Sequence, residues 1–299
     1  MKRFPLPPHA LLDPAAIAVA LSFLVLIPSA GEAHQYWLTP SRYRVEAGET
    51  VELGAAVGTG FRGRGVTWDP GRCVRLAARS KAALDLSREP ASGERIWIRL
   101  RPADSGGTMF AFESNFRPIE LPAAEFEHYL RDEGLDAALH ARRNTPDLPG
   151  RERYRRCAKL WLAGDDASRA TEPVGLPLEI VPLSAPGTRE ELSVRVLADG
   201  SPIRGLLVKA WNRPLQPSGG PLDLEARDSV GVVWSGRTDE RGEVTIPLGY
   251  AGEWLVSVVR MEKSGDPDEA DWESTWASLT FERRESAAPA PSTASRARP

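Results

Sequence analysis

Short runs in which apolar and polar residues alternate dominate the chain after residue 34. Residues 42–58 contain two such runs separated by Ala47-Gly48, and residues 96–101 place Ile96, Ile98 and Leu100 on one face of an extended segment. Similar runs occupy residues 106–115, 191–212 and 253–260, with Gly, Pro or Asp-Gly between them. Period-two alternation bounded by turn residues predicts short β-strands. The pattern therefore predicts a mainly β fold of Ig-like β-sandwiches.

One segment has a helical period instead. Phe126, Leu130, Leu135 and Leu139 follow one another at helical intervals, and Gly134 interrupts them. Apolar residues at this spacing line one face of a helix. We expect two short helices, at about 123–143, inserted into the first β-sandwich.

The strand pattern and two composition shifts predict the domain organisation. A first sandwich with the helical insert spans 34–183, and a second sandwich spans 191–284. The stretch SAPGTRE at 184–190 contains Pro186 and Gly187 and is expected to be a linker. Residues 285–299 are rich in Pro, Ala and Ser and are expected to form a disordered tail.

The first 33 residues have the pattern of a secretory signal peptide. Lys2 and Arg3 precede the uncharged apolar run Ala15–Ile27, which is too short for a comfortable membrane span. Gly31 and Ala33 occupy the −3 and −1 positions of a cut after Ala33, and a cut after Ala30 is the alternative. The prediction is a periplasmic or secreted protein that does not span a membrane after cleavage.

The net charge and the cysteine content bear on nucleic-acid binding and on disulfide formation. The formal net charge of −3 gives no basic excess for binding nucleic acid. Cys73 and Cys157 are the only cysteines of the chain. In an oxidising compartment they form one disulfide or remain two buried thiols that never meet, and spacing alone leaves both alternatives open.

Several stretches resemble a known family. They are AHQYWL at 33–38, YRVEAGETVEL at 43–53, EFEHYLRDEGLDAAL at 125–139, PGRERYRRCAKL at 149–160, VGLPLEIVP at 174–182, VRVLADGSPI at 194–203 and DWESTWASLTFE at 271–282. The chain is similar to an exported bacterial domain of unknown function described as NikM-like, the periplasmic component of nickel/cobalt transport. The second sandwich resembles transthyretin-like, carboxypeptidase-regulatory-like modules. The resemblance implies nickel or cobalt handling and a membrane transporter or outer-membrane receptor as partner.

A candidate metal site follows from the expected cut. Cleavage after Ala33 makes His34 the first residue, so its free amine and its imidazole can chelate one ion. Two neutral nitrogen ligands suit Cu(II) or Ni(II). His128 and Asp132, four residues apart on the expected helix, are the further candidate ligands. The alternatives are a solvated helix face and an ordinary first residue of a strand.

The sequence lacks the motifs that usually indicate catalysis. GxSxG and HExxH are absent, and no catalytic dyad is apparent, so we expect no enzyme. The basic run at 151–159 is expected to pair with the acidic helices just upstream, with an anion site as the alternative. The leading hypothesis is a metal-binding or metal-uptake accessory protein using Cu, Ni or Co. A module that binds protein or glycan without metal is the alternative, and a copper oxidase acting on polysaccharide is a third.

Overall fold

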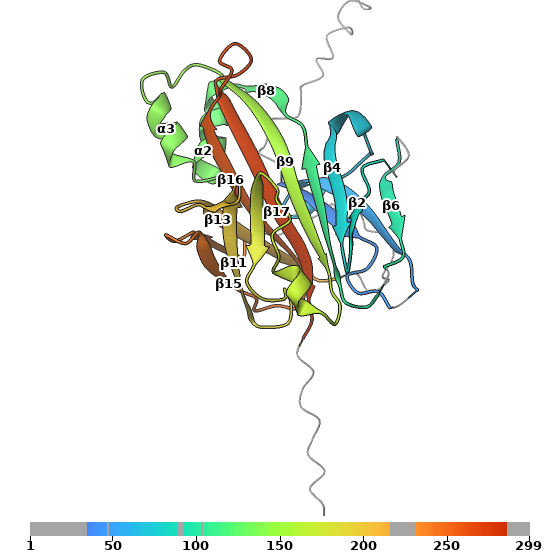
Figure 1. The fold of residues 1–299 in the computed structure, drawn as a ribbon. Helices are drawn as coiled ribbons and strands as arrows, with labels where there is room; N and C mark the ends of the chain where they lie inside the picture. The colour runs from blue at the N-terminus through green and yellow to red at the C-terminus, as the bar shows by residue number, and fades with distance from the viewer. Residues whose placement is uncertain (1–34, 47, 89–92, 103, 216–230, 286–299) are drawn as a thin grey trace, which may run out of the picture. The chain divides into compact units, whose positions relative to one another are not determined.

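A computed structural model describes residues 35–46, 48–88, 93–102, 104–215 and 231–285 (Figure 1). The described residues all belong to one compact unit. They are mainly β and form packed sheets, as the alternating patterns predict. The expected signal peptide, His34 and the expected tail after residue 285 lie outside these residues. Within them, no helix combines the length and apolar character needed to cross a membrane.

The largest sheet, here called the central sheet, runs in the order β14-β13-β16-β17-β9-β7-β4-β5. Strands β7 and β8 pair with the same edge of β9, β8 with its first half and β7 with its second half. Its strands are β4 (Cys73–Arg79), β5 (Ala83–Asp85), β7 (Thr108–Ser114), β8 (Arg117–Leu121), β9 (Gly150–Leu162), β13 (Leu207–Arg213), β14 (Trp234–Arg237), β16 (Gly252–Lys263) and β17 (Trp272–Arg283). The β17–β9 pair is parallel, whereas the other pairs of this sheet are antiparallel.

Two smaller sheets cover the central sheet. The N-terminal sheet comprises β1 (Gln35–Pro40), β2 (Val51–Thr59), β3 (Arg62–Val66) and β6 (Ile96–Leu100). The β11 sheet comprises β10 (Leu178–Pro182), β11 (Glu191–Ala198), β12 (Ser201–Pro202) and β15 (Glu243–Pro247).

Opposite faces of the central sheet form separate cores. On β9, Cys157 and Trp161 belong to the core shared with the β11 sheet, whereas Ala158 and Leu160 belong to the core shared with the N-terminal sheet. Successive side chains of a strand point to opposite faces, so β9 is buried from both sides. The central sheet is therefore the middle layer of two sandwiches that share it.

The expected division at 184–190 does not separate two sheets. Strand β17 lies beside β9 (Figure 1), with Trp272 opposite Glu152 and Thr280 opposite Leu160. The segment between the expected domains is itself packed, because a Cβ on Gly187 would lie 1.9 Å from the carbonyl oxygen of Glu282. Strands from both expected domains thus form one sheet. Local periodicity does not report a pairing between segments about 120 residues apart, which is why the pattern predicted two independent units.

The helical insert is confirmed as α2 (Ala123–Asp132) and α3 (Asp136–Arg142), between β8 and β9. Phe126, Tyr129 and Leu130 of α2 pack in one cluster with Trp272 and Trp276 of β17. This cluster lies on the face of the central sheet that the N-terminal sheet also covers, since Tyr154 of β9 joins it and Ala158 joins the other core. The helices and the N-terminal sheet therefore cover different parts of one face.

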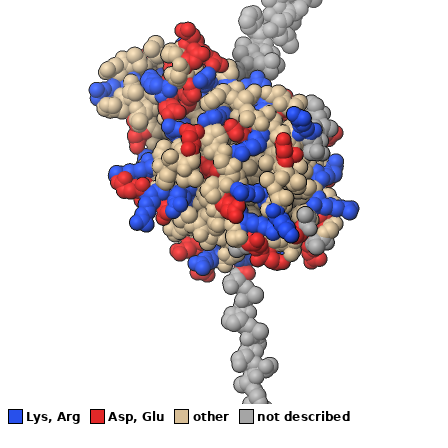
Figure 2. Space-filling view, viewed as in Figure 1, with Lys and Arg blue, Asp and Glu red and all other residues tan. Residues whose placement is uncertain are grey.

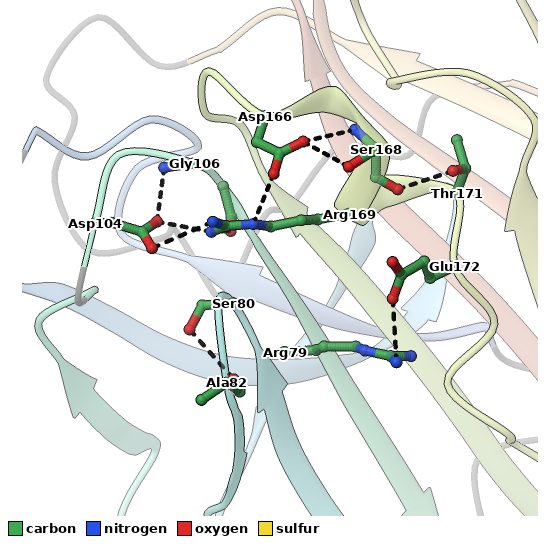
Figure 3. Close-up of polar contacts among 11 residues, drawn as sticks. Arg79, Ser80, Ala82, Asp104, Gly106, Asp166, Ser168, Arg169, Thr171 and Glu172 are labelled. Carbon is green, nitrogen blue, oxygen red and sulfur yellow. Dashed lines mark hydrogen bonds and ion pairs between the residues drawn. The ribbon is translucent and has the colours of Figure 1, made fainter.

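Two short 3-10 helices are held by side-chain contacts. The first, η1 (Pro70–Arg72), is capped by Asp69, which accepts a hydrogen bond from the Gly71 amide. The second is η2 (Ala167–Ala170), whose Arg169 pairs with Asp104 at 2.7 Å and with Asp166 at 3.2 Å (Figure 3). These contacts attach the connection after β9 to the loop that precedes β7. On the face shown in Figure 2, acidic and basic side chains are interspersed.

Candidate ligand-binding pocket

The structure brings His128 together with Asp132 but with no third candidate ligand. The His128 Nε2 and Asp132 Oδ2 atoms are 3.2 Å apart on α2, and the two side chains are 78% and 56% exposed. Among the described residues, no group of three or more His, Cys, Asp or Glu side chains is placed to hold a metal ion. His34 lies outside the described residues, so the metal chelate expected at the N-terminus stays a prediction.

Cys73 and Cys157 are separate thiols in the structure. Strand β7 lies between them, with Ser114 opposite Cys73 and Glu113 opposite Cys157. Two strand spacings are about 10 Å, beyond the reach of a disulfide. They also belong to different cores, Cys157 beside the β11 sheet and Cys73 beside the N-terminal sheet. The alternative of one disulfide therefore differs from the structure, which has two thiols that do not meet.

A pocket with about 330 Å³ of empty space, partly open to solvent, lies between the N-terminal sheet and the central sheet. Its walls come from β1, β6, β7, β9 and the segment from the end of β3 to η1. The lining residues are Tyr36, Val66, Thr67, Trp68, Asp69, Arg72, Trp97, Phe112, Ser114 and Arg156.

Aromatic rings form one continuous wall of this pocket. Tyr36 stacks on Phe112 with 5.5 Å between ring centroids, and Trp97 lies 5.2 Å from Phe112 and 5.0 Å from Trp68. The indole N–H of Trp97 donates to the carbonyl oxygen of Val66 at 2.9 Å. Because each ring packs against the next, the wall is pre-formed and needs little ordering when a ligand enters.

Arg156 is the unusual residue of the pocket. Its guanidinium lies over the rings of Tyr154, at 4.9 Å, and Trp276, at 4.6 Å. Within the described part of the chain its side-chain nitrogens have no hydrogen-bond partner, and Nη1 is fully buried. Burial lowers the pKa of Arg156 below its ordinary value. A buried guanidinium nitrogen without a hydrogen-bond partner is costly, so Nη1 calls for a partner from outside the chain.

Other charges near Arg156 leave the pocket positive. Arg72 also lines it and, among the described residues, forms no ion pair. Asp69 is the only carboxylate of the lining, and it accepts from the Gly71 amide and lies 3.8 Å from Arg117. Two guanidinium groups therefore face one carboxylate that already has partners.

A second carboxyl group, Glu152, acts on Arg156 from beneath the helices. It is buried on β9 and accepts hydrogen bonds from the hydroxyls of Ser274 and Tyr129. Burial raises the pKa of Glu152 to about 7, although these hydrogen bonds and Arg156 lower it. Below that pH Glu152 is mostly protonated and does not neutralise Arg156, whereas above it the charged carboxylate opposes the Arg156 charge.

Tyr36 supplies a hydroxyl donor to the same pocket. Burial raises its pKa well above the ordinary value, and the charges of Arg72 and Arg156 only partly oppose this. The hydroxyl therefore keeps its proton near neutral pH. It has no hydrogen-bond partner in the described ranges, so its proton is available to a ligand.

The basic run at 151–159 pairs differently from the expectation. Arg153 contacts Glu269 at 2.7 Å and Glu273 at 2.6 Å, and Arg151 lies 3.6 Å from Asp271. These acids precede or begin β17, so the expected pairing with the upstream helices was wrong for these two arginines. Strand alternation was the signal that could have distinguished Arg156 from the arginines that form ion pairs. In a strand, Arg156 shares a face with Tyr154 and Ala158, and Arg153 lies on the opposite face.

The three layers and the partly open pocket define the chain as a β-sandwich protein with a candidate ligand site. It belongs to the family described as a domain of unknown function (DUF4198), whose model matches residues 31–262. No curated protein matches the chain. One solved structure similar to it is the D0-D1 domain of intimin, at 11% sequence identity and a TM-score of 0.19, with 83% of this chain and 97% of that chain covered.

Proposed function

We propose that this chain is a non-enzymatic binding protein that holds a small organic ligand in the aromatic pocket. The single observation that supports it most is Arg156 in the pocket wall, whose buried Nη1 has no hydrogen-bond partner among the described residues. Concave, mostly apolar sites with a few polar groups are typical of small-molecule binding. This develops the alternative from the sequence, an interaction module that works without metal.

The polar lining residues support binding rather than chemistry. The Ser114 hydroxyl donates to the carbonyl oxygen of Asn115 at 2.9 Å and accepts from the Arg156 amide at 2.9 Å, so it has no general base. Asp69 is engaged by Gly71 and Arg117. A nucleophile needs a neighbouring base to become active. The lining contains no such pair among its residues.

A panel of ligands tests the proposal. Trp68 and Trp97 line the pocket, so binding should change tryptophan emission saturably and raise the unfolding temperature. Neutral aromatics, aromatic acids, aromatic amines and sugars form the panel. Thr67→Trp, at an exposed lining position, should weaken binding by filling space, whereas Thr245→Trp on β15 should not. Failure of the whole panel to bind, or equal binding by Thr67→Trp, would contradict the proposal.

Metal handling is a separate proposal that depends on His34. The NikM-like resemblance, the expected export and the free amine after cleavage support it, and the partner would be a transporter or an outer-membrane receptor. Protein beginning at His34 should bind Cu(II) orders of magnitude more tightly than protein with one extra residue before it. Calorimetry at pH 7 should give the same loss for His34→Ala and a smaller effect for His128→Ala. Equal affinities in all four proteins would leave only the ligand-binding proposal.

A further inference from the structure

We infer that the pocket takes a small planar aromatic carboxylate, with its ring against the aromatic wall and its carboxylate against Arg156. The inference rests on the proposed ligand-binding function and names the chemical class of the ligand. It combines three observations, which are the unpaired guanidinium, the apolar wall and the limited space.

The unpaired guanidinium requires an anion. Tyr154 and Trp276 both pack against the guanidinium of Arg156, so its orientation is fixed before any ligand binds. A guanidinium group presents its N–H donors in a planar fork, the geometry that matches a carboxylate. Arg72 adds a second positive charge to the same lining. Together they favour an anionic group over a neutral or cationic one.

The wall requires an apolar body. The Trp97 indole N–H is occupied by Val66, and the Ser114 hydroxyl is occupied by Asn115 and Arg156. The neutral side-chain donors of the lining that have no partner among the described residues are the Tyr36 hydroxyl, the Trp68 indole N–H and, at the exposed rim, the Thr67 hydroxyl. A sugar would bury several hydroxyls without partners here, which is unfavourable. A flat ring that stacks on Tyr36, Phe112 or Trp97 meets the wall without that penalty.

The space limits the ligand to about one ring system. The empty volume of about 330 Å³ includes open solvent at the mouth. The space enclosed by the walls is therefore smaller than that figure, which favours a small ligand over a large one. A single-ring acid such as benzoate is therefore the appropriate probe.

Matched probes separate the charge from the ring. Benzoate and benzamide have nearly the same shape, and only benzoate is charged, whereas inorganic phosphate is an anion without a ring. Calorimetry at pH 6 on the chain from residue 34 should show benzoate binding roughly ten- to a hundredfold more tightly than benzamide, the range for a charge-assisted hydrogen bond. Phosphate should bind more weakly than benzoate.

Arginine variants assign the charge to its residue. Arg156→Met keeps most of the volume and should reduce the benzoate-to-benzamide affinity ratio to about one. The control is Arg155→Met, on the neighbouring position of β9 but on the opposite face, where Arg155 donates to Thr275 at 3.0 Å. It should retain the wild-type ratio. If Arg156→Met does not fold, as judged by circular dichroism, Arg72→Met serves instead and should lower the ratio.

The outcomes distinguish this inference from the proposed function. Equal affinity for benzoate and benzamide would overturn the anionic class, while the pocket would remain a binding site. Phosphate binding as tightly as benzoate would overturn the aromatic class. A wild-type ratio retained in folded Arg156→Met, or in Arg72→Met where Arg156→Met does not fold, would overturn the assigned anchor. Binding of other panel compounds but not of benzoate would overturn the inference as a whole, and no binding at all would overturn the proposed function as well.

Discussion

The buried ion pair between Lys159 and Glu179 gives the sharpest prediction about stability. Lys159 lies on β9 and Glu179 on β10, so the pair joins the central sheet to the β11 sheet. The Lys159 Nζ and Glu179 Oε1 atoms are 2.7 Å apart, and both side chains are 1% exposed. Removing one partner of a buried pair costs about 3–5 kcal/mol, because the other charge stays buried. The two partners are not equivalent, however.

Glu179 has backbone partners that Lys159 lacks. Its Oε1 also accepts from the Val174 amide at 2.8 Å, and its Oε2 accepts from the amides of Gly175 at 2.8 Å and Leu176 at 3.2 Å. In Lys159→Met the carboxylate keeps these three donors, so the loss should be near the lower limit, about 3 kcal/mol. In Glu179→Gln an NH₂ group replaces one of the two carboxylate oxygens. It then faces either Lys159 and the Val174 amide or the amides of Gly175 and Leu176. Two donors then lose an acceptor, at about 1–3 kcal/mol each, and the charge of Lys159 is also left unpaired.

Urea unfolding followed by circular dichroism at pH 7 measures both losses. Glu179→Gln should destabilise the protein more than Lys159→Met does. The matched control is Glu240→Gln, which breaks the exposed pair of Arg204 and Glu240 and should change the free energy of unfolding by less than about 1 kcal/mol. A Glu179→Gln protein within 1 kcal/mol of wild type, or less destabilised than Lys159→Met, would refute the reasoning.

Three further predictions concern acid titration, thiols and domain structure. Burial raises the pKa of Glu152 from 4.5 to about 7, so the folded state holds its proton more tightly than the unfolded state does. Wild type should therefore lose about 3 kcal/mol relative to Glu152→Gln as the pH rises from 4 to 8, and parallel unfolding curves would contradict this. Burial raises the pKa of Cys73 to about 11 and of Cys157 to about 12, so both remain protonated and unreactive at pH 8 in the folded protein. Alkylation at pH 8 without reductant, read by mass spectrometry, should therefore label the two thiols only after the protein has been unfolded. Labelling of neither in denatured, non-reduced protein would indicate a disulfide. The fragment 191–285 should lack a cooperative thermal transition because it lacks β9, and a cooperative transition would show that the second sandwich folds alone.

The sequence predicted most of the local structure of this chain. The alternating runs become strands, and the helical period at 123–143 becomes α2 and α3. Each of these elements could be predicted from a window of about a dozen residues around it. The pairing of β17 with β9 leaves no comparable signal, because the pattern along one strand does not identify the strand that lies beside it in the sheet.

The pocket could be predicted only in part. Arg156 stands in a basic run that local charge arguments assign to surface pairing, and that argument is appropriate for Arg151 and Arg153. The rings that pack on the Arg156 guanidinium come from Tyr154, two positions away, and from Trp276, which is 120 residues further along the chain. The tryptophan content of the sequence therefore indicates that the protein has aromatic cores, but it does not reveal which ring packs against the Arg156 guanidinium.

The parallel β17–β9 pair also constrains the order in which the protein can fold. Strand β17 ends at Arg283, and it occupies the middle of the central sheet, between β16 and β9. Until that strand has been synthesised, β9 and β16 each present a long unpaired edge, the kind of edge that promotes association between chains. Closing the sheet joins segments far apart in sequence, which slows folding. We therefore expect truncation before residue 272 to give an aggregating chain rather than a smaller native one, and nascent chains to need protection until their last strand is made.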